Sequence, residues 1–135
     1  MPLEQLVNRS PDYSDLDLDF FKHPTTKDVS MKIGTEAVKR SVRNLIMTNF
    51  YDRPFQSYIG SDVRALLFEN SDPFTAVRLQ QAIETCLFNF EKRVSVQSVV
   101  VSEDIDNHGY SVRIEYIILN KEQPVVQTIF LERIR

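Results

Sequence analysis

The sequence is short of the residues from which disulfides, metal sites and phosphate-binding loops are made. It has one cysteine, Cys86, among 135 residues, so an intramolecular disulfide is excluded. Two histidines and this single cysteine, far apart in the chain, do not form a zinc-binding pattern. The three glycines stand alone, so none belongs to a glycine-rich phosphate loop. The sequence therefore predicts no metal site and no cofactor.

Long apolar runs and an excess of positive charge are also missing. No apolar stretch reaches the roughly 18 residues that cross a bilayer, so no membrane contact is expected. The N-terminus lacks the basic start and apolar core of a secretory signal, which favours synthesis and residence in a reducing cytoplasm. The formal net charge is −3 at pH 7, so we expect no nucleic-acid binding, because that requires an excess of cations.

Candidate catalytic groups are few. Cys86 lies in a helical apolar pattern, where a small buried thiol is the usual interpretation, and the two histidines lie in turn-like contexts. Glu69, paired with Asp62 or Asp72, could serve a glycosidase only if two carboxylates faced each other across a cleft. Helix capping explains both aspartates more simply, since Pro73 after Asp72 suits the first turn of a helix. The sequence therefore predicts no catalytic residue.

The first 33 residues are predicted to form an extended N-terminal arm, and residues 34–135 a single domain. Three prolines interrupt the arm. Alternation of apolar and polar residues over 15–20 and 29–33 predicts two short strands within it. The alternative is a weakly ordered acidic terminus.

Three helices are predicted to open the domain, over 35–49, from 62 to about 70, and from 73 to about 90, because each carries an apolar stripe at helical spacing. The segment 50–61 between the first two contains four aromatic residues. A polar surface loop would not need them, so the segment is expected to pack down as a short hairpin or folded loop. Gly60 is expected to supply a backbone angle closed to other residues, or a close approach of two chain segments.

After Arg93 the hydrophobic period changes to two, which predicts an antiparallel meander of three strands. The apolar residues of the second strand fall on one face, which is the main buried face: Tyr110, Val112, Ile114, Tyr116 and Ile118. A change of phase near Gln97 and Ser98 predicts a bulge, and Gly109 is expected to supply the turn geometry of a hairpin. Helices followed by strands predict an α+β fold, in which the helices cover one face of the sheet.

The last predicted strand carries apolar residues on both of its faces, which a sheet covered on one side does not require. Val126, Thr128 and Phe130 form one face, and Ile129 on the other is expected to lie opposite the main buried face. Such a strand at a chain end favours pairing with another chain. The alternative is that the acidic arm folds back and covers it.

Three adjacent charged residues, Glu91, Lys92 and Arg93, lie between the longest helix pattern and the first strand of the meander. A solvated bend is the simpler interpretation, and a corner that docks on a partner is the other. The surrounding motifs bear on this choice.

Several motifs follow one another in a specific order, namely Arg53-Pro54-Phe55, Gly60, Leu67-Phe68-Glu69, Pro73, and Glu91 with Arg93. In this order they resemble the baseplate wedge, or sheath-initiator, family of T-even-like contractile-tailed phages, which is related to a type VI secretion baseplate component. The resemblance covers roughly residue 28 to the C-terminus. Lys92 departs from it, because the family pattern has proline there.

The resemblance implies a structural protein of a phage tail baseplate in the virion, assembled in the host cytoplasm. It implies docking on other baseplate wedge proteins, with tail tube or hub proteins nearby, and initiation of tail sheath polymerisation by strand addition. The alternative is a lysozyme-like cell-wall hydrolase, because members of this family have been labelled so. The candidate partner-binding residues are Glu91, Lys92, Arg93, Arg53, Val126, Thr128 and Phe130.

Overall fold

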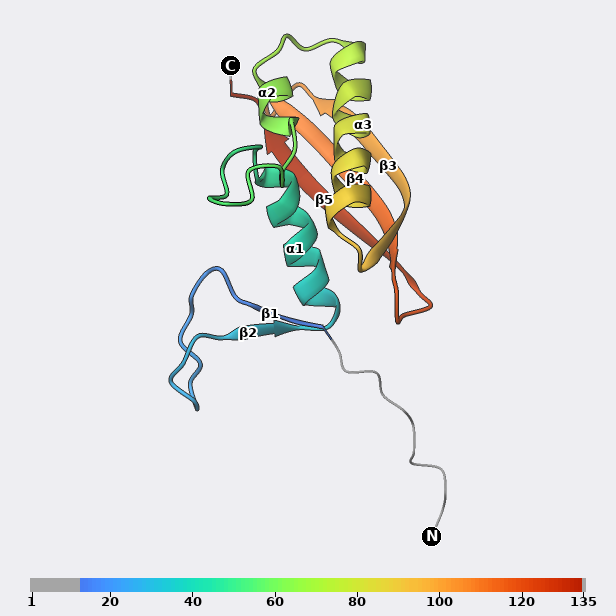
Figure 1. Ribbon diagram of the computed structural model, residues 1–135. Helices are drawn as coiled ribbons and strands as arrows, with labels where there is room; N and C mark the ends of the chain where they lie inside the picture. The colour runs from blue at the N-terminus through green and yellow to red at the C-terminus, as the bar shows by residue number, and fades with distance from the viewer. Residues whose placement is uncertain (1–12, 135) are drawn as a thin grey trace. The chain divides into compact units, whose positions relative to one another are not determined.

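The computed structural model describes residues 13–134, which divide into two compact units at Val38 and Lys39 (Figure 1). The part of the predicted arm before Tyr13 lies outside the described residues. Helices and an antiparallel sheet of three strands confirm the predicted α+β class. The elements in chain order are β1 (Ser14–Leu16), β2 (Met31–Ile33), α1 (Thr35–Met47), α2 (Val63–Leu67), α3 (Pro73–Phe90), β3 (Val94–Asp104), β4 (Gly109–Ile118) and β5 (Pro124–Glu132).

The described part of the first unit is built on a short hairpin. Strands β1 and β2 pair antiparallel, with Leu16 opposite Met31, so the two predicted strands are confirmed in shorter form. Asp17 follows β1 and is almost fully buried, and its carboxylate lies 3.4 Å from Lys32 Nζ. The N–H of Asp19 donates to the same carboxylate at 3.2 Å. An ion pair and a turn bond therefore hold the chain where it leaves the strand.

The caps of the helices explain where they begin. Asp72 accepts a hydrogen bond from Thr75 N at 2.8 Å and Pro73 occupies the first turn of α3, as predicted. Asp62 precedes α2, but its side chain makes no capping bond, so the predicted Asp62 cap is wrong. Helix α2 also ends at Leu67, earlier than predicted.

The core of the second unit lies on one face of the sheet, whose strand order is β3-β4-β5. Figure 1 shows α3 running along β3 and β4 on this face. Burying a large apolar side chain contributes about 1.5–3 kcal/mol, so the central strand contributes much of the stability. The predicted bulge is confirmed between Val96 and Ser98. The predicted buried face of β4 is also confirmed, and consists of Tyr110, Val112, Ile114, Tyr116 and Ile118.

Two predictions about the sheet are wrong. Ile129 lies opposite Val112 and is buried, because residues that face each other across antiparallel strands share one face. Gly109 does not supply the turn angle, since it is His108 that adopts a positive φ, of 52°. A Cβ on Gly109 would lie 2.4 Å from the carbonyl oxygen of Leu131, so glycine is needed there for close approach of β5.

The prediction for the aromatic segment between α1 and α2 is partly wrong. The backbone is folded, since Tyr51 N donates to Ser57 O at 2.8 Å. The aromatic side chains do not pack down, however, because Tyr51, Phe55 and Tyr58 are 84%, 104% and 65% exposed. Backbone hydrogen bonds close this loop, so its side chains are not needed as anchors.

Candidate docking site

The charged corner between α3 and β3 has a fixed backbone. Glu91 ends the helix in an extended conformation, and its N–H still donates to Leu87 O at 3.0 Å. Two residues later, Arg93 O accepts the N–H of Leu119, just beyond β4, at 2.9 Å. The corner is therefore tied to the helix at one end and to the sheet at the other. This excludes a loose solvated bend.

The carboxylate of Glu91 points into the protein and binds its own chain. It is 6% exposed and accepts hydrogen bonds from Arg93 Nε at 2.8 Å and from Arg93 Nη2 at 3.0 Å. It also accepts Ser41 Oγ from α1 at 2.6 Å. Two parallel bonds from one guanidinium are a strong and directional form of ion pair. Glu91 therefore joins α1 to the corner and orients Arg93, rather than offering a free charge to a partner.

The environment of Glu91 lowers its pKa. Burial acts to raise the pKa of the carboxyl, but hydrogen bonds from Arg93 and Ser41, with the positive charge of Arg93, outweigh this effect. The pKa consequently lies below the ordinary value of 4.5, and the group is ionised at neutral pH.

This lowered pKa predicts a loss of stability in acid. A carboxyl whose pKa is lower in the folded state contributes stability above its unfolded pKa, and the contribution disappears as the pH falls through the folded pKa. Between about pH 5 and about pH 3 the free energy of unfolding should therefore fall more steeply for the wild type than for Glu91→Gln. Urea unfolding at a series of pH values measures both slopes.

The matched control for this measurement is Glu122→Gln, which alters an exposed glutamate in the turn before β5. Its pH profile should follow that of the wild type. Equal slopes for the wild type and Glu91→Gln over the same range would contradict the assigned role of the Glu91 carboxylate.

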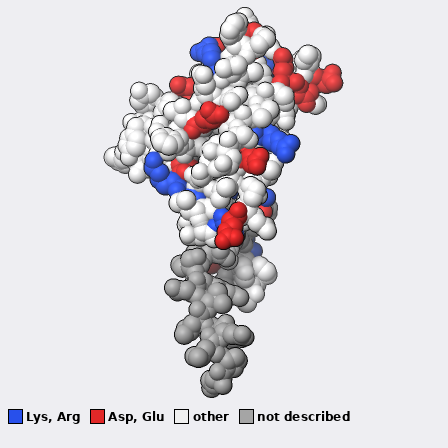
Figure 2. All heavy atoms as spheres, turned by 90° about the vertical axis from the view of Figure 1, so that its right-hand side faces the viewer, with Lys and Arg blue, Asp and Glu red and all other residues white. Residues whose placement is uncertain are grey.

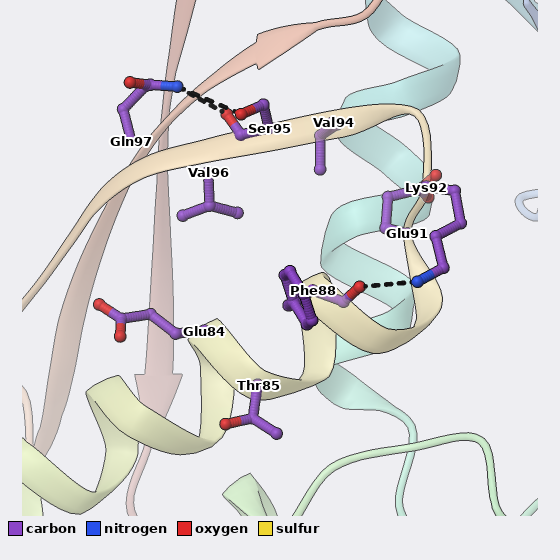
Figure 3. A pocket seen from close by; sticks show the side chains of 9 residues that line it. All are labelled: Glu84, Thr85, Phe88, Glu91, Lys92, Val94, Ser95, Val96 and Gln97. Carbon is purple, nitrogen blue, oxygen red and sulfur yellow. Dashed lines mark hydrogen bonds between the residues drawn. The ribbon is translucent and has the colours of Figure 1, made fainter.

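Lys92 is the exposed member of the corner. Its Nζ donates to Phe88 O, in the last turn of α3, at 3.1 Å and lies 5.5 Å from the centre of the Phe88 ring (Figure 3). A cation at the C-terminus of a helix donates to a carbonyl oxygen that has no partner within the helix, and it interacts favourably with the negative end of the helix dipole. Lys92 thus stabilises the joint between α3 and β3 through a side-chain hydrogen bond. The proline that the family pattern has at this position would instead stiffen the backbone.

A groove opens beside the corner between the end of α3 and the start of β3 (Figure 3). Its volume is about 730 Å³, and Phe88, Val94 and Val96 supply apolar surface while Glu84 and Lys92 supply charge. Phe88 is 79% exposed, although it belongs to the longest helix. The groove offers apolar and charged contacts side by side, as protein-binding surfaces do.

The predicted residues of the last strand lie on an open edge. Along an antiparallel strand, every second N–H group points toward the neighbouring strand and the others point away from it. Arg133 N donates to His108 O at 2.8 Å, so the N–H of Arg133 points toward the β4 side. Following the register from there, the N–H groups of Val126, Thr128 and Phe130 point away from β4. Since β5 is the last strand of the sheet, these groups lie at its edge. Their side chains are exposed as well.

The candidate residues thus fall into three places. The structure brings Glu91, Lys92 and Arg93 together at the corner, while the strand residues lie on β5 and Arg53 lies in the exposed loop before α2. Sequence reasoning missed Ser41, which is 50 residues from Glu91 and has no local signal. It also missed Phe88, because which side chains of this amphipathic helix are buried is decided by tertiary packing.

Other kinds of site find no support in the part of the chain that the structure describes. Within residues 13–134 no group of three metal-ligating side chains comes together, and no helix is long and apolar enough to cross a membrane. Burial raises the pKa of the Cys86 thiol to about 11, which leaves very little of the reactive thiolate at neutral pH. On the face that Figure 2 shows, acidic and basic side chains are interspersed.

Comparison with known sequences identifies relatives of the chain. Residues 33–123 match a family model described as baseplate wedge protein gp25. The baseplate wedge protein gp25 of Enterobacteria phage T4 is 31% identical over 122 residues, which cover 90% of this chain and 92% of the relative.

Solved structures with the same fold include two baseplate chains and a putative tail lysozyme. A chain of the anti-feeding prophage baseplate has a TM-score of 0.64 at 20% identity, with 89% of this chain and 85% of that chain covered. A chain of the pyocin R2 baseplate after contraction has a TM-score of 0.56 at 16% identity, with 87% of this chain and 98% of that chain covered. A putative tail lysozyme from Geobacter sulfurreducens has a TM-score of 0.60 at 19% identity, with 73% of this chain and 91% of that chain covered. At these identities the likeness shows the fold alone.

Proposed function

The chain belongs to the baseplate wedge protein gp25 family, and we propose that within a contractile tail it joins the baseplate to the first ring of the sheath. Membership makes it a structural component of the tail baseplate, with other baseplate proteins as partners. The proposal adds two roles to this. The corner would dock on the wedge, and the β5 edge would accept a strand of the sheath protein.

The open edge of β5 is the observation that carries the sheath role. Val126, Thr128 and Phe130 direct their N–H groups outward, and no other described residue accepts a backbone bond from them. An added strand would bond to these groups, and the exposed side chains of the same residues would set its register. The partly exposed Val126 and Phe130 (44% and 46%) supply apolar contact. Sheath growth would then begin only on chains already held in the baseplate.

The corner supports the wedge role by its rigidity. Glu91 is ionised and buried, and it fixes the guanidinium of Arg93, whose side chain keeps 23% of its surface exposed. Lys92 and the groove beside it complete a surface whose charges are already oriented. A partner would therefore lose little conformational entropy in ordering these side chains on binding.

Thr128→Pro tests strand addition. Proline removes the outward N–H of residue 128 and leaves the β4–β5 ladder intact, since proline is tolerated on edge strands. We expect the purified variant to melt within a few degrees of the wild type. Phage carrying it should assemble baseplates but yield about tenfold fewer sheathed tails, counted by electron microscopy.

Thr128→Ala is the matched control, because it changes the same side chain and keeps the N–H. It should give sheathed tails at the wild-type level. A Thr128→Pro variant that also gives normal numbers of sheathed tails would rule out strand addition at this edge.

A lysozyme-like hydrolase has less support. Glu69, the glutamate considered for such a reaction, forms an exposed ion pair with Arg78. Asp72 caps α3 through Thr75 N. Both carboxylates have structural partners and neither lies among the lining residues of the groove beside the corner. We therefore propose that the chain is not an enzyme.

A further inference from the structure

The loop between α1 and α2 displays aromatic side chains that the fold does not use. In this segment, residues 50–59 and here called the aromatic loop, Tyr51 and Phe55 are 84% and 104% exposed. Tyr58 is also largely exposed, and the centre of its ring lies 6.5 Å from that of the Phe90 ring. Large rings placed in water contribute nothing to folding by burial.

The backbone of the aromatic loop is nevertheless held firmly. Tyr51 N donates to Ser57 O at 2.8 Å, and Asn49 N donates to the Asp52 carboxylate at 3.0 Å. At the base, Ser61 N donates to Thr48 O at 2.9 Å, so the two ends of the loop are joined. The backbone from which the rings project is therefore held in one fold and is not a flexible tether.

Two of the displayed residues have unfavourable backbone angles. Tyr51 and Phe55 have φ of +71° and +66°, a region that bulky residues rarely adopt. A residue held at such an angle is strained, and strain of this kind concentrates at functional sites. The ring of Phe55 is fully exposed, so no contact with the other residues of 13–134 offsets this strain. Its position is explained if the ring is buried in a partner.

A concave surface of about 710 Å³ adjoins the aromatic loop where it meets α2. Tyr51 and Phe50 form one side of it, and Phe68 on the other side is 48% exposed. Tyr51 belongs to both the loop and this hollow, whose lining also includes the charged residues Asp62 and Arg64. Buried aromatic and arginine side chains dominate the binding energy of protein interfaces, and this surface contains both.

The charge of the loop indicates the kind of surface that it fits. The carboxylate of Asp52 is engaged with Asn49 N, whereas the exposed guanidinium of Arg53 has no ion-pair partner among the described residues. The tip thus combines an apolar ring with a guanidinium that is available to form an ion pair. We propose that the aromatic loop is a docking surface for a second baseplate protein, whose binding site is an apolar pocket rimmed by carboxylates. This inference rests on the proposed function, and it adds a contact separate from the corner and from β5.

Incorporation in competition tests the proposal. Wild-type chain and a variant of different mass are produced together during infection, and their ratio is measured by mass spectrometry in purified tails. Phe55→Ala should be under-represented about tenfold, and Arg53→Glu likewise, because each removes one anchor of the interface. Both purified variants should melt like the wild type, since neither side chain is buried.

Ile105→Ala is the matched control, because Ile105 is also an exposed apolar residue (74%) but lies in the β3–β4 turn. It should enter tails at a ratio near one. Entry of Phe55→Ala at that same ratio would overturn the docking surface and leave the proposed function standing. Absence of the wild-type chain from purified tails would overturn the proposed function and this inference together.

A photo-reactive phenylalanine analogue at position 55, irradiated in intact tails, identifies the occupant. The expected adduct is with another baseplate protein, at a peptide that contains apolar residues and at least one carboxylate. An adduct with a second copy of this chain, or no adduct at all, would overturn the proposal.

Discussion

Arg93→Ala should lower the free energy of unfolding by about 3 kcal/mol, a fall in Tm of roughly 10 °C for a domain of this size. Removing the guanidinium leaves the Glu91 carboxylate buried, with Ser41 as its remaining side-chain partner. Breaking one side of a buried ion pair is costly because the other charge stays uncompensated. Since Arg93 is partly exposed, we place the effect at the low end of the range for such pairs. Thermal and urea unfolding measure it.

Lys92→Ala is the control for position and charge. It removes the neighbouring cation but leaves the Glu91 pair intact, so it should change the free energy of unfolding by less than about 0.5 kcal/mol. The double variant Glu91→Gln with Arg93→Ala should be less destabilised than the sum of its single changes. An Arg93→Ala protein as stable as Lys92→Ala would show that the pair does not hold the corner.

The same pair decides how docking at the corner is to be tested. A tail that lacks the Arg93→Ala chain would not by itself show a lost contact, because the corner would have lost its internal support. The Lys92 side chain is exposed and donates to Phe88 O, not to the Glu91 carboxylate, so substitutions there report on docking without this complication.

Gly60→Ala should be about as damaging, with a loss on the order of 3 kcal/mol from backbone strain and overpacking together. Gly60 has a φ of +155°, and a Cβ would lie 2.5 Å from the carbonyl carbon of Asn49 and 2.7 Å from Phe50 N. These neighbours are backbone atoms and have no rotamer by which to move aside. The free energy of unfolding and Tm are the quantities to measure.

Gln56→Ala, an exposed change within the same loop, is the matched control and should be nearly neutral. The prediction for Gly60 fails if its alanine variant melts together with Gln56→Ala. Because Gly60 lies at the base of the aromatic loop, its variant should also disturb the display of Phe55. A loss of incorporation in Gly60→Ala would for this reason not count as evidence for the loop contact.

What could be predicted from the sequence is what local physics decides. The period of two along β4 placed Tyr110 to Ile118 on a buried face, and a phase change located the bulge near Ser98. Asp72 and Pro73 marked the start of α3, because a capping carboxylate and a first-turn proline act within one turn of helix. The spacing of several motifs also indicated the family, which the comparisons confirm.

What the sequence could not supply depends on contacts between distant segments. The bond from Ser41 to Glu91 turns an apparently displayed charge into an internal support, and no pattern links two residues 50 positions apart. Register, which the alternation within one strand leaves open, put Ile129 on the buried face. The aromatic loop is a second example. Its aromatic content led to the prediction that its side chains are buried, because large rings are usually buried in a core. Only the tertiary structure shows that backbone bonds close this loop and leave Phe55 in solvent.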